Sequence, residues 1–112
     1  SIHNMKASSW SERTLQVIHK MLSSHEPSIA DVANMFHVNE RTLSRRLKEE
    51  ETTFRQLLQE KRIELAEYYL TQTTLSITEI TFNLSFTDVS NFSRAFQRWR
   101  GISPSDYRQK HT

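Results

Sequence analysis

One short stretch of the chain carries cationic side chains at a spacing that could bind a polyanion. Four of its residues follow spacings of three and four, so they share one face if the stretch is helical: Arg41, Ser44, Arg45 and Lys48. An arginine on such a face can donate two hydrogen bonds to the O6 and N7 atoms of guanine, while other cations meet phosphates. The spacing therefore predicts a helix that could enter the major groove of DNA.

A second stretch repeats part of this face. Arg94 takes the place of Arg45, and Asn91 adds an amide group, which can hydrogen-bond to adenine. The two candidate recognition helices run over about 40–50 and 88–100.

Both stretches belong to an internal repeat. Residues 28–40 align with 76–88 at an offset of 48, and 43–48 (LSRRLK) align with 92–97 (FSRAFQ) at an offset of 49. Each copy opens with a serine followed three positions later by an acidic residue, which is the spacing of a capping box. Such a repeat indicates two copies of one supersecondary unit, here a short helix, a turn and a second helix.

Ion pairing within the first candidate helix is the alternative to DNA contact. Arg45 precedes Glu49 by four residues, and Arg46 precedes Glu50 by four, so these carboxylates could neutralise the positive charge. Arg46 lies off the cationic face, where either interpretation is open. For Arg45 the pairing interpretation is weaker, because Arg94 repeats this residue in the second copy.

The stretch between the copies predicts one long helix. Thr53 can serve as its N-cap, and neither Gly nor Pro occurs up to Leu70. Apolar residues recur at helical spacing near both ends, whereas Lys61 and Arg62 interrupt the apolar face in the middle. We therefore expect a helix about 27 Å long that buries both ends and exposes its centre to water.

Further helices are predicted on either side of the repeat. Ser9 has capping-box spacing and opens a helix that ends near Ser24, with Trp10 as a packing residue. Gly101 can end the second candidate recognition helix, and a short helix over 103–109 follows.

Composition argues against several classes of protein. The 112-residue chain has no cysteine, and its five histidines lack metal-ligand spacing. Because it also lacks a glycine-rich phosphate loop and a Gly-x-Ser-x-Gly motif, we expect no enzyme, no metal and no cofactor. Short apolar runs and the lack of a signal segment predict no membrane contact. The net charge of +2 leans toward an anionic partner, and a helical protein-binding module is the alternative.

Three runs resemble one known family. Residues 75–108, LSITEITFNLSFTDVSNFSRAFQRWRGISPSDYR, are similar to the second helix-turn-helix and terminal helix of the AraC/XylS family of bacterial transcription regulators. Residues 28–50 (SIADVANMFHVNERTLSRRLKEE) and 54–70 (FRQLLQEKRIELAEYYL) resemble its first helix-turn-helix and its connecting helix. The resemblance extends over residues 10–109.

This resemblance implies an all-α fold of about seven helices, with two helix-turn-helix subdomains joined by a long connecting helix. The expected division is 1–8 disordered terminus or linker, 9–52 first subdomain, 53–71 connecting helix and 72–112 second subdomain. The implied function is regulation by sequence-specific binding of double-stranded promoter DNA, in the cytoplasm at the nucleoid. Further implied partners are RNA polymerase, if the protein is an activator, and an upstream effector or dimerisation domain absent from this chain.

The resemblance also implies roles for individual residues. The base-reading positions of the first recognition helix are Arg41, Thr42, Ser44 and Arg45. Those of the second are Val89, Ser90, Asn91, Ser93 and Arg94. Phosphate contacts are expected from Asn39, Lys48, Thr87 and Arg98.

Three positions depart from the family pattern. The family usually has glycine where this chain has His37, Glu51 and Ser85, and Gly101 is the only glycine present. If the three positions still require a positive φ, each non-glycine residue costs about 1 kcal/mol. The fold should survive, but the turn angles, and so the aim of each recognition helix, could change.

Overall fold

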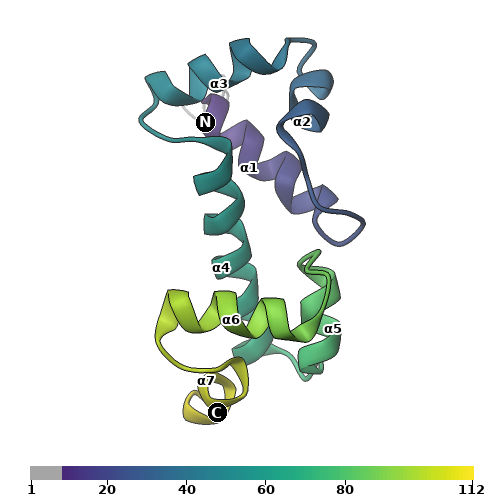
Figure 1. Cartoon of the computed structure of the whole chain (residues 1–112), viewed down its shortest axis with the longest axis vertical. Coiled ribbons are helices and arrows are strands. Elements are labelled where there is room, and N and C mark those ends of the chain that lie inside the picture. The colour runs from purple at the N-terminus through teal and green to yellow at the C-terminus, as the bar shows by residue number, and fades with distance from the viewer. Residues whose placement is uncertain (1–8) are drawn as a thin grey trace, which may run out of the picture.

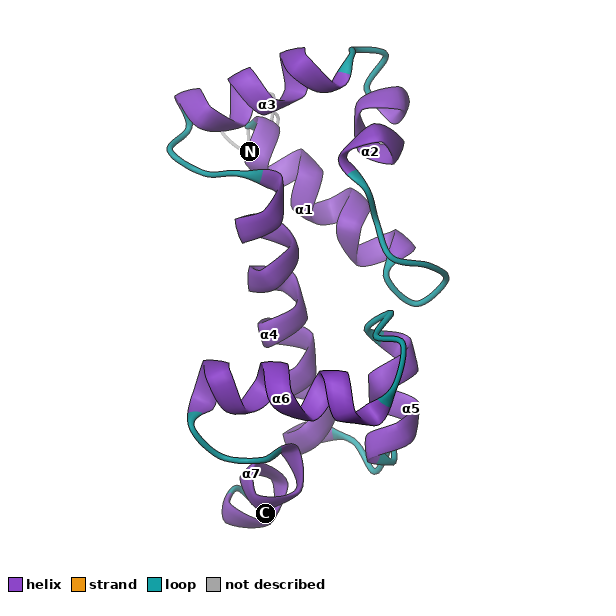
Figure 2. Ribbon diagram, in the orientation of Figure 1, coloured by secondary structure: helices purple, strands orange, loops and turns teal. Residues whose placement is uncertain are grey.

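The computed structural model describes residues 9–112, and the predicted disordered terminus or linker at 1–8 lies outside the described residues. Helices connected by loops make up the whole described part (Figures 1 and 2). In chain order they are α1 (Trp10–Met21), α2 (Ile29–Met35), α3 (Glu40–Glu49), α4 (Phe54–Gln72), α5 (Ile77–Asn83), α6 (Val89–Arg100) and α7 (Pro104–Lys110). The expected all-α fold of seven helices is confirmed.

Most helices begin where the sequence predicts. Ser9, Ser28 and Ser76 each accept a hydrogen bond from the backbone three residues on, and the acidic residue there accepts one from the serine N–H. Asn39 and Thr53 cap α3 and α4 through their side-chain oxygens. These caps satisfy N–H groups that the first turn of a helix leaves without partners.

Two helix ends differ from the prediction. α1 stops at Met21 rather than near Ser24, because the N–H groups of Ser24 and His25 both turn back to the Met21 carbonyl, at 2.8 and 3.0 Å. α4 continues to Gln72, two residues beyond Leu70, and stops where Thr73 adopts an extended conformation.

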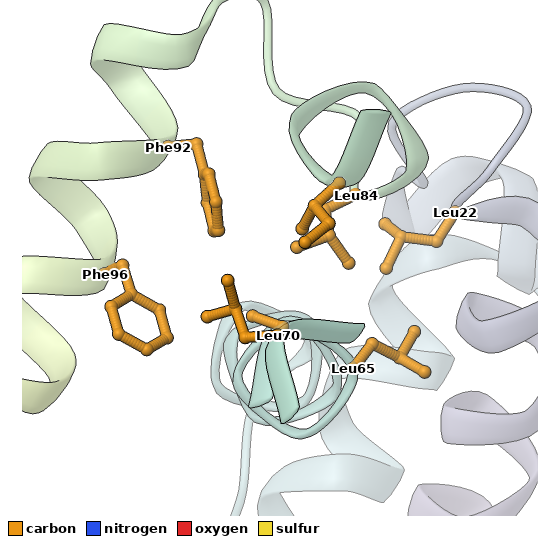
Figure 3. Packing of buried hydrophobic residues seen from close by; sticks show 8 residues of the cluster. Leu22, Leu65, Leu70, Leu84, Phe92 and Phe96 are labelled. Atoms are coloured by element: carbon orange, nitrogen blue, oxygen red, sulfur yellow. The ribbon is translucent and has the colours of Figure 1, made fainter. Parts of the chain in front are cut away.

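The described helices form two cores, and α4 contributes to both. We call α1–α3 the N-terminal unit and α5–α7 the C-terminal unit. The first core consists of Val17, Ile18, Val32, Ala33, Leu43, Leu47 and Leu57. The second consists of Leu22, Leu65, Ala66, Leu70, Ile80, Leu84, Phe92 and Phe96 (Figure 3). Leu22 follows α1, so the N-terminal unit supplies a residue to the core of the C-terminal unit, which the sequence did not suggest.

The three turn positions that lack the family glycine do adopt positive φ. The angle is 57° at His37, 62° at Glu51 and 60° at Ser85, close to the left-handed region. Gly101 has φ of 81° at the end of α6, as its position predicts. The chain therefore keeps the turns despite the cost of non-glycine residues there.

The expectation that the centre of α4 is exposed to water is wrong for Arg62. This residue is only 9% exposed, and its guanidinium donates hydrogen bonds to backbone carbonyls of the turn between α5 and α6. Lys61 is half-buried and pairs with Glu64 of its own helix at 3.2 Å. Helical periodicity cannot reveal the Arg62 environment, because its acceptors lie more than 20 residues away along the chain.

Candidate nucleic-acid interface

The two candidate recognition helices lie across opposite ends of α4. In Figure 1, α3 and α6 run in the same direction, with their N-terminal ends on the same side. The 19 residues of α4 span about 28 Å. Two helices that enter successive major-groove segments on one face of B-DNA lie about 34 Å apart. The length of α4, together with the offset of each unit at its ends, suits that separation.

α3 buries one side and exposes the cationic one. Leu43 and Leu47 are fully buried in the first core. On the other side, the predicted contact residue Thr42 is half-buried. The remaining predicted contact residues of this side are exposed: Asn39, Arg41, Ser44, Arg45 and Lys48. A shallow hollow of about 380 Å³ is lined by Asn39, Arg41, Thr42 and Arg45. Both arginines of this face are therefore accessible to a ligand.

The ion-pairing alternative fails for Arg45 and holds for Arg46. Within the described chain Arg45 forms no hydrogen bond or ion pair, so the possible pair with Glu49 is not made. Arg46 lies 3.5 Å from Glu49 instead of pairing with Glu50. The positive charge of Arg45 on the predicted base-reading face therefore stays available to a ligand, whereas the charge of Arg46 beside it is partly neutralised by Glu49.

Glu50 has a different role, which the sequence did not reveal. Its carboxylate accepts hydrogen bonds from the N–H groups of Trp10 at 3.0 Å and Ser11 at 2.9 Å, at the start of α1. Burial opposes ionisation of this carboxylate, but the hydrogen bonds from Ser11 and Trp10 outweigh burial, and the pKa of Glu50 is lowered. The Trp10 ring packs edge-on against Phe36, as expected for a packing residue. The end of α3 is thus joined to the start of α1.

α6 buries a wider, aromatic face. Phe92, Ala95 and Phe96 are buried, and Tyr107 of α7 packs against Phe96 with 5.1 Å between ring centroids. The predicted contact residues of this unit fall into two groups. Thr87, Ser90, Arg94 and Arg98 are exposed, whereas Val89, Asn91 and Ser93 are half-buried.

Arg94 is held in place by Asn91, one turn earlier on α6. Its guanidinium donates to the Asn91 Oδ1 atom at 2.5 Å. The Asn91 amide nitrogen donates in turn to Thr87 Oγ1 at 2.6 Å and to Asp88 Oδ2 at 3.3 Å. The amide predicted to meet adenine is therefore engaged within the protein, where it orients the arginine.

A cleft of about 780 Å³ opens beside this face of α6. Its lining includes Asn91, Arg94 and Arg98 of α6, together with residues 23–26 of the loop that follows α1. This position of the loop beside α6 could not be predicted from the sequence, because the loop and the helix are separated by more than 60 residues.

Comparison with known proteins identifies the family. Residues 32–110, more than half of the chain, match the family model described as a helix-turn-helix domain. The ornithine utilization regulator of Pseudomonas aeruginosa is 45% identical over 83 residues, which are 74% of this chain and 24% of that protein. The chain belongs to the AraC/XylS family. Members of this family are DNA-binding transcription regulators.

Solved structures agree with this AraC/XylS assignment. A DNA-binding transcriptional dual regulator from Escherichia coli K-12 has a TM-score of 0.86 at 26% identity and covers 95% of both chains. The DNA-binding domain of AdpA, solved in complex with a target DNA, has a TM-score of 0.75 at 20% identity and covers 92% of this chain and 93% of its own. The second likeness supports the fold alone.

Three further findings concern the AraC/XylS-family chain. None of the described helices is long and apolar enough to cross a membrane. Residues 9–112 contain no group of three or more His, Cys, Asp or Glu side chains that could hold a metal ion. The chain spans about a quarter of the length of the first curated relatives that it matches, at 24%.

Proposed function

We propose that α3 and α6 enter successive major-groove segments on one face of promoter DNA. The observation that carries the proposal is the parallel course of the two helices at the two ends of α4 (Figure 1), together with an exposed arginine on each helix. The protein would cover about two turns of the duplex. If the helices are closer together than one turn, the DNA must bend to meet both.

The base-reading residues of the proposal are those predicted from the sequence. On α3 they are Arg41, Thr42, Ser44 and Arg45, and on α6 they are Val89, Ser90, Asn91, Ser93 and Arg94. Arginines suit the O6 and N7 atoms of guanine, and the methyl groups of Val89 suit the methyl group of thymine. Because Asn91 already holds Arg94 at 2.5 Å, we assign it to orienting that arginine as well as to base contact.

Phosphates would be bound at the edges of the two helices. Lys48 and Arg98 are exposed cations beside the base-reading faces, and Asn39 and Thr87 lie just before the helix N-termini. Helix N-termini carry partial positive charge and free N–H groups, which favour phosphate. These contacts would fix the register of the protein without carrying sequence information.

The wider setting of the proposal follows the family. The division into subdomains 9–52 and 72–112 about a connecting helix at 53–71 fits the two cores, although Leu22 crosses that division. We place the protein in the cytoplasm at the nucleoid. RNA polymerase, if the regulator is an activator, and an upstream effector or dimerisation domain are its further partners.

Selection of bound sequences from random DNA tests the proposal directly. We expect an enriched site with two half-sites about 10 base pairs apart. Affinity for that site should fall at least about ten-fold between about 50 and 200 mM salt, because two phosphate-binding cations each release a counterion. Failure to enrich any sequence, or enrichment of one half-site alone, contradicts the proposal. Binding of a protein partner with little salt dependence would instead support the helical interaction module.

A further inference from the structure

A buried arginine in the middle of α4 contacts both units of the molecule at once. Arg62 Nε donates to the carbonyl of Leu84 at 2.8 Å, and Nη2 donates to the carbonyl of Ser85 at 3.1 Å, in the turn that precedes α6. Nη2 also lies 3.0 Å from the Glu26 carboxylate, in the loop between α1 and α2. The guanidinium carbon stands 4.2 Å from the centroid of the Phe86 ring. We call this set of contacts the Arg62 bridge.

A second contact between the units lies beside the bridge. The Ser85 hydroxyl donates a hydrogen bond to the carbonyl of Leu22, the residue that follows α1. The Leu22 side chain is 1% exposed and belongs to the same core cluster as Leu65 and Leu84 (Figure 3). The end of α1 is therefore attached to the turn before α6 through both backbone and side chain.

The chemistry of the bridge is specific to arginine. Its planar fork of five donors can serve two carbonyls and a carboxylate together, which the single ammonium of lysine cannot do with the same geometry. Burial lowers the pKa of Arg62, and the Glu26 carboxylate acts in the opposite direction. Arginine stays protonated in proteins, so the bridge persists over the physiological pH range. In contrast, the ion pair that the structure shows for the neighbouring Lys61 lies within α4, at 3.2 Å from Glu64.

The position of the bridge gives it a mechanical consequence. If the connecting helix were the only link, each unit would be attached along a single line. Rotation of a unit about that helix would then be restrained only by the packing at its own end. A contact between the units away from the helix axis removes that freedom. The bridge is such a contact, because it joins the loop leading into α2 to the turn leading into α6.

Resting on the proposed function, we propose that Arg62 is a positioning residue that sets the relative placement of α3 and α6. It thereby selects the spacing between half-sites that the protein accepts on DNA. Two linked binding helices gain from each other only when their geometry matches both sites at once. Loss of the bridge should therefore weaken binding at the native spacing and relax the requirement for that spacing.

Distance measurements on the protein without DNA test the bridge itself. The chain has no cysteine, so Lys48→Cys and Gln97→Cys allow spin labels at equivalent positions of α3 and α6. We expect a narrow distribution of distances in the labelled parent protein and a broader one with Arg62→Met. Lys61→Met is the matched control, since it removes the neighbouring charge from the same helix, and its distribution should stay narrow.

Binding to altered DNA tests the consequence for spacing. With Arg62→Met, affinity for the selected site should fall about ten-fold, while the penalty for one added base pair between half-sites should be smaller than in the parent protein. Binding to a duplex with one half-site should be unchanged. If Arg62→Met does not fold, Glu26→Ala decides the matter, because the Glu26 side chain is 63% exposed and its removal leaves the two carbonyl contacts intact. It should broaden the distances to a lesser degree.

The outcomes separate this proposal from the proposed function. A distance distribution as narrow in the folded variants as in the parent overturns the role of Arg62, whatever the DNA results. An unchanged spacing penalty in a variant with broadened distances also overturns it. Should the parent protein bind no DNA, the proposed function fails, whereas the distance measurement still tests the bridge.

Discussion

The two proposed recognition helices present their arginines in different ways. Arg94 of α6 is held by Asn91, which is itself held by Thr87 and Asp88. Arg45 occupies the same place in the repeat but has no such partner in the described chain. A side chain that is already ordered loses less conformational entropy when it binds, whereas an unheld one can adapt to several partners. We therefore expect α6 to discriminate between bases more sharply than α3.

The caps of the two helices differ in charge. Asn39 caps α3 with a neutral amide, while Asp88 caps α6 with a carboxylate that also holds Asn91. A carboxylate beside a DNA-binding face repels phosphate. The two copies of the repeated unit therefore differ, because α6 combines an arginine held by Asn91 with a less favourable local charge.

Removal of either arginine should produce the largest change. Arg45→Ala and Arg94→Ala should each weaken binding to the selected site by about 1–3 kcal/mol and relax the base preference in one half of it. The comparison predicts that Arg94→Ala loses more preference, measured by repeating the selection with each variant. Arg46→Ala is the control, because that arginine lies off the face and pairs with Glu49 at 3.5 Å. If neither arginine matters in a folded protein, the recognition helices are misassigned.

Loss of the residue that orders Arg94 should have the next largest effect. Asn91→Ala frees the guanidinium and should weaken binding by about 1 kcal/mol, the cost of ordering one long side chain. Thr42, the equivalent residue of α3, has no comparable contact with Arg45, so Thr42→Ala should have a smaller effect. NMR relaxation of the Arg94 side chain in the free protein reports the mobility directly. If the Arg94 side chain is no more mobile in Asn91→Ala than in the parent protein, the contrast drawn between α6 and α3 has no basis.

Exchanging the charge of the two N-cap residues should change DNA affinity in opposite directions. Asp88→Asn keeps a capping side chain while removing a negative charge, and should strengthen DNA binding by about 0.5–1 kcal/mol at low salt. Asn39→Asp should weaken binding by a similar amount. Both effects should shrink as salt rises, which titration of affinity against ionic strength can detect. Changes of the same sign in both variants would show that cap charge is not the relevant difference.

Glycine substitutions at His37 and Ser85 should change the stability of the fold by different amounts. His37→Gly relieves a positive φ at an exposed residue and should stabilise the fold by about 0.5–1 kcal/mol. Ser85→Gly relieves the same strain but deletes the hydrogen bond to the Leu22 carbonyl, so its gain should be smaller or absent. Denaturant unfolding measures both. Equal stabilisation by the two substitutions would show that the Ser85 hydroxyl contributes nothing.

Acid should affect the N-terminal unit first, by a small amount. Hydrogen bonds from Ser28 lower the pKa of Asp31, and the pKa of Glu50 is lowered from 4.5. Hydrogen bonds from Ser76 also lower the pKa of Glu79, which belongs to the C-terminal unit. A folded pKa below the unfolded value gives stability that is present above the unfolded value and lost as pH falls through the folded one. Hydrogen exchange between about pH 5 and 3 should show earlier opening of α1 and α2.

A substitution at Glu50 isolates its share of that acid sensitivity. Glu50→Gln should flatten the dependence of unfolding free energy on pH in the same range, because glutamine does not titrate. Gln59→Ala, an exposed change on α4 that involves no titrating group, is the control and should leave the slope unaltered. An equal slope in the two variants would assign the acid sensitivity to other carboxyls.

Features encoded over short distances were predictable from the sequence. Capping serines, the helical spacing of leucines and phenylalanines, and positive φ at His37, Glu51 and Ser85 depend on neighbouring residues or on family pattern. The exposed faces of α3 and α6 followed from the same spacing. Contact of those faces with DNA stays a prediction.

Features that depend on distant parts of the chain were not predictable. The Arg62 bridge joins a charged residue to carbonyls 22 and 23 residues away, and a carboxylate 36 residues away. Glu50 looked like a partner for Arg46 because both lie on one helix, yet its carboxylate serves α1. In each case the sequence shows that the residue is charged, but only the three-dimensional structure shows which groups it contacts.

The burial of Leu22 in the second core limits how this molecule can be divided. The family match begins at residue 32, so a recombinant fragment cut to that boundary would lack Leu22 and Glu26. Such a fragment would retain every proposed DNA-contacting residue and still carry a leucine-sized void next to Leu84, with Arg62 deprived of its counter-charge. A fragment intended to retain both proposed recognition helices in a complete fold should therefore include α1 from its Ser9 cap onward.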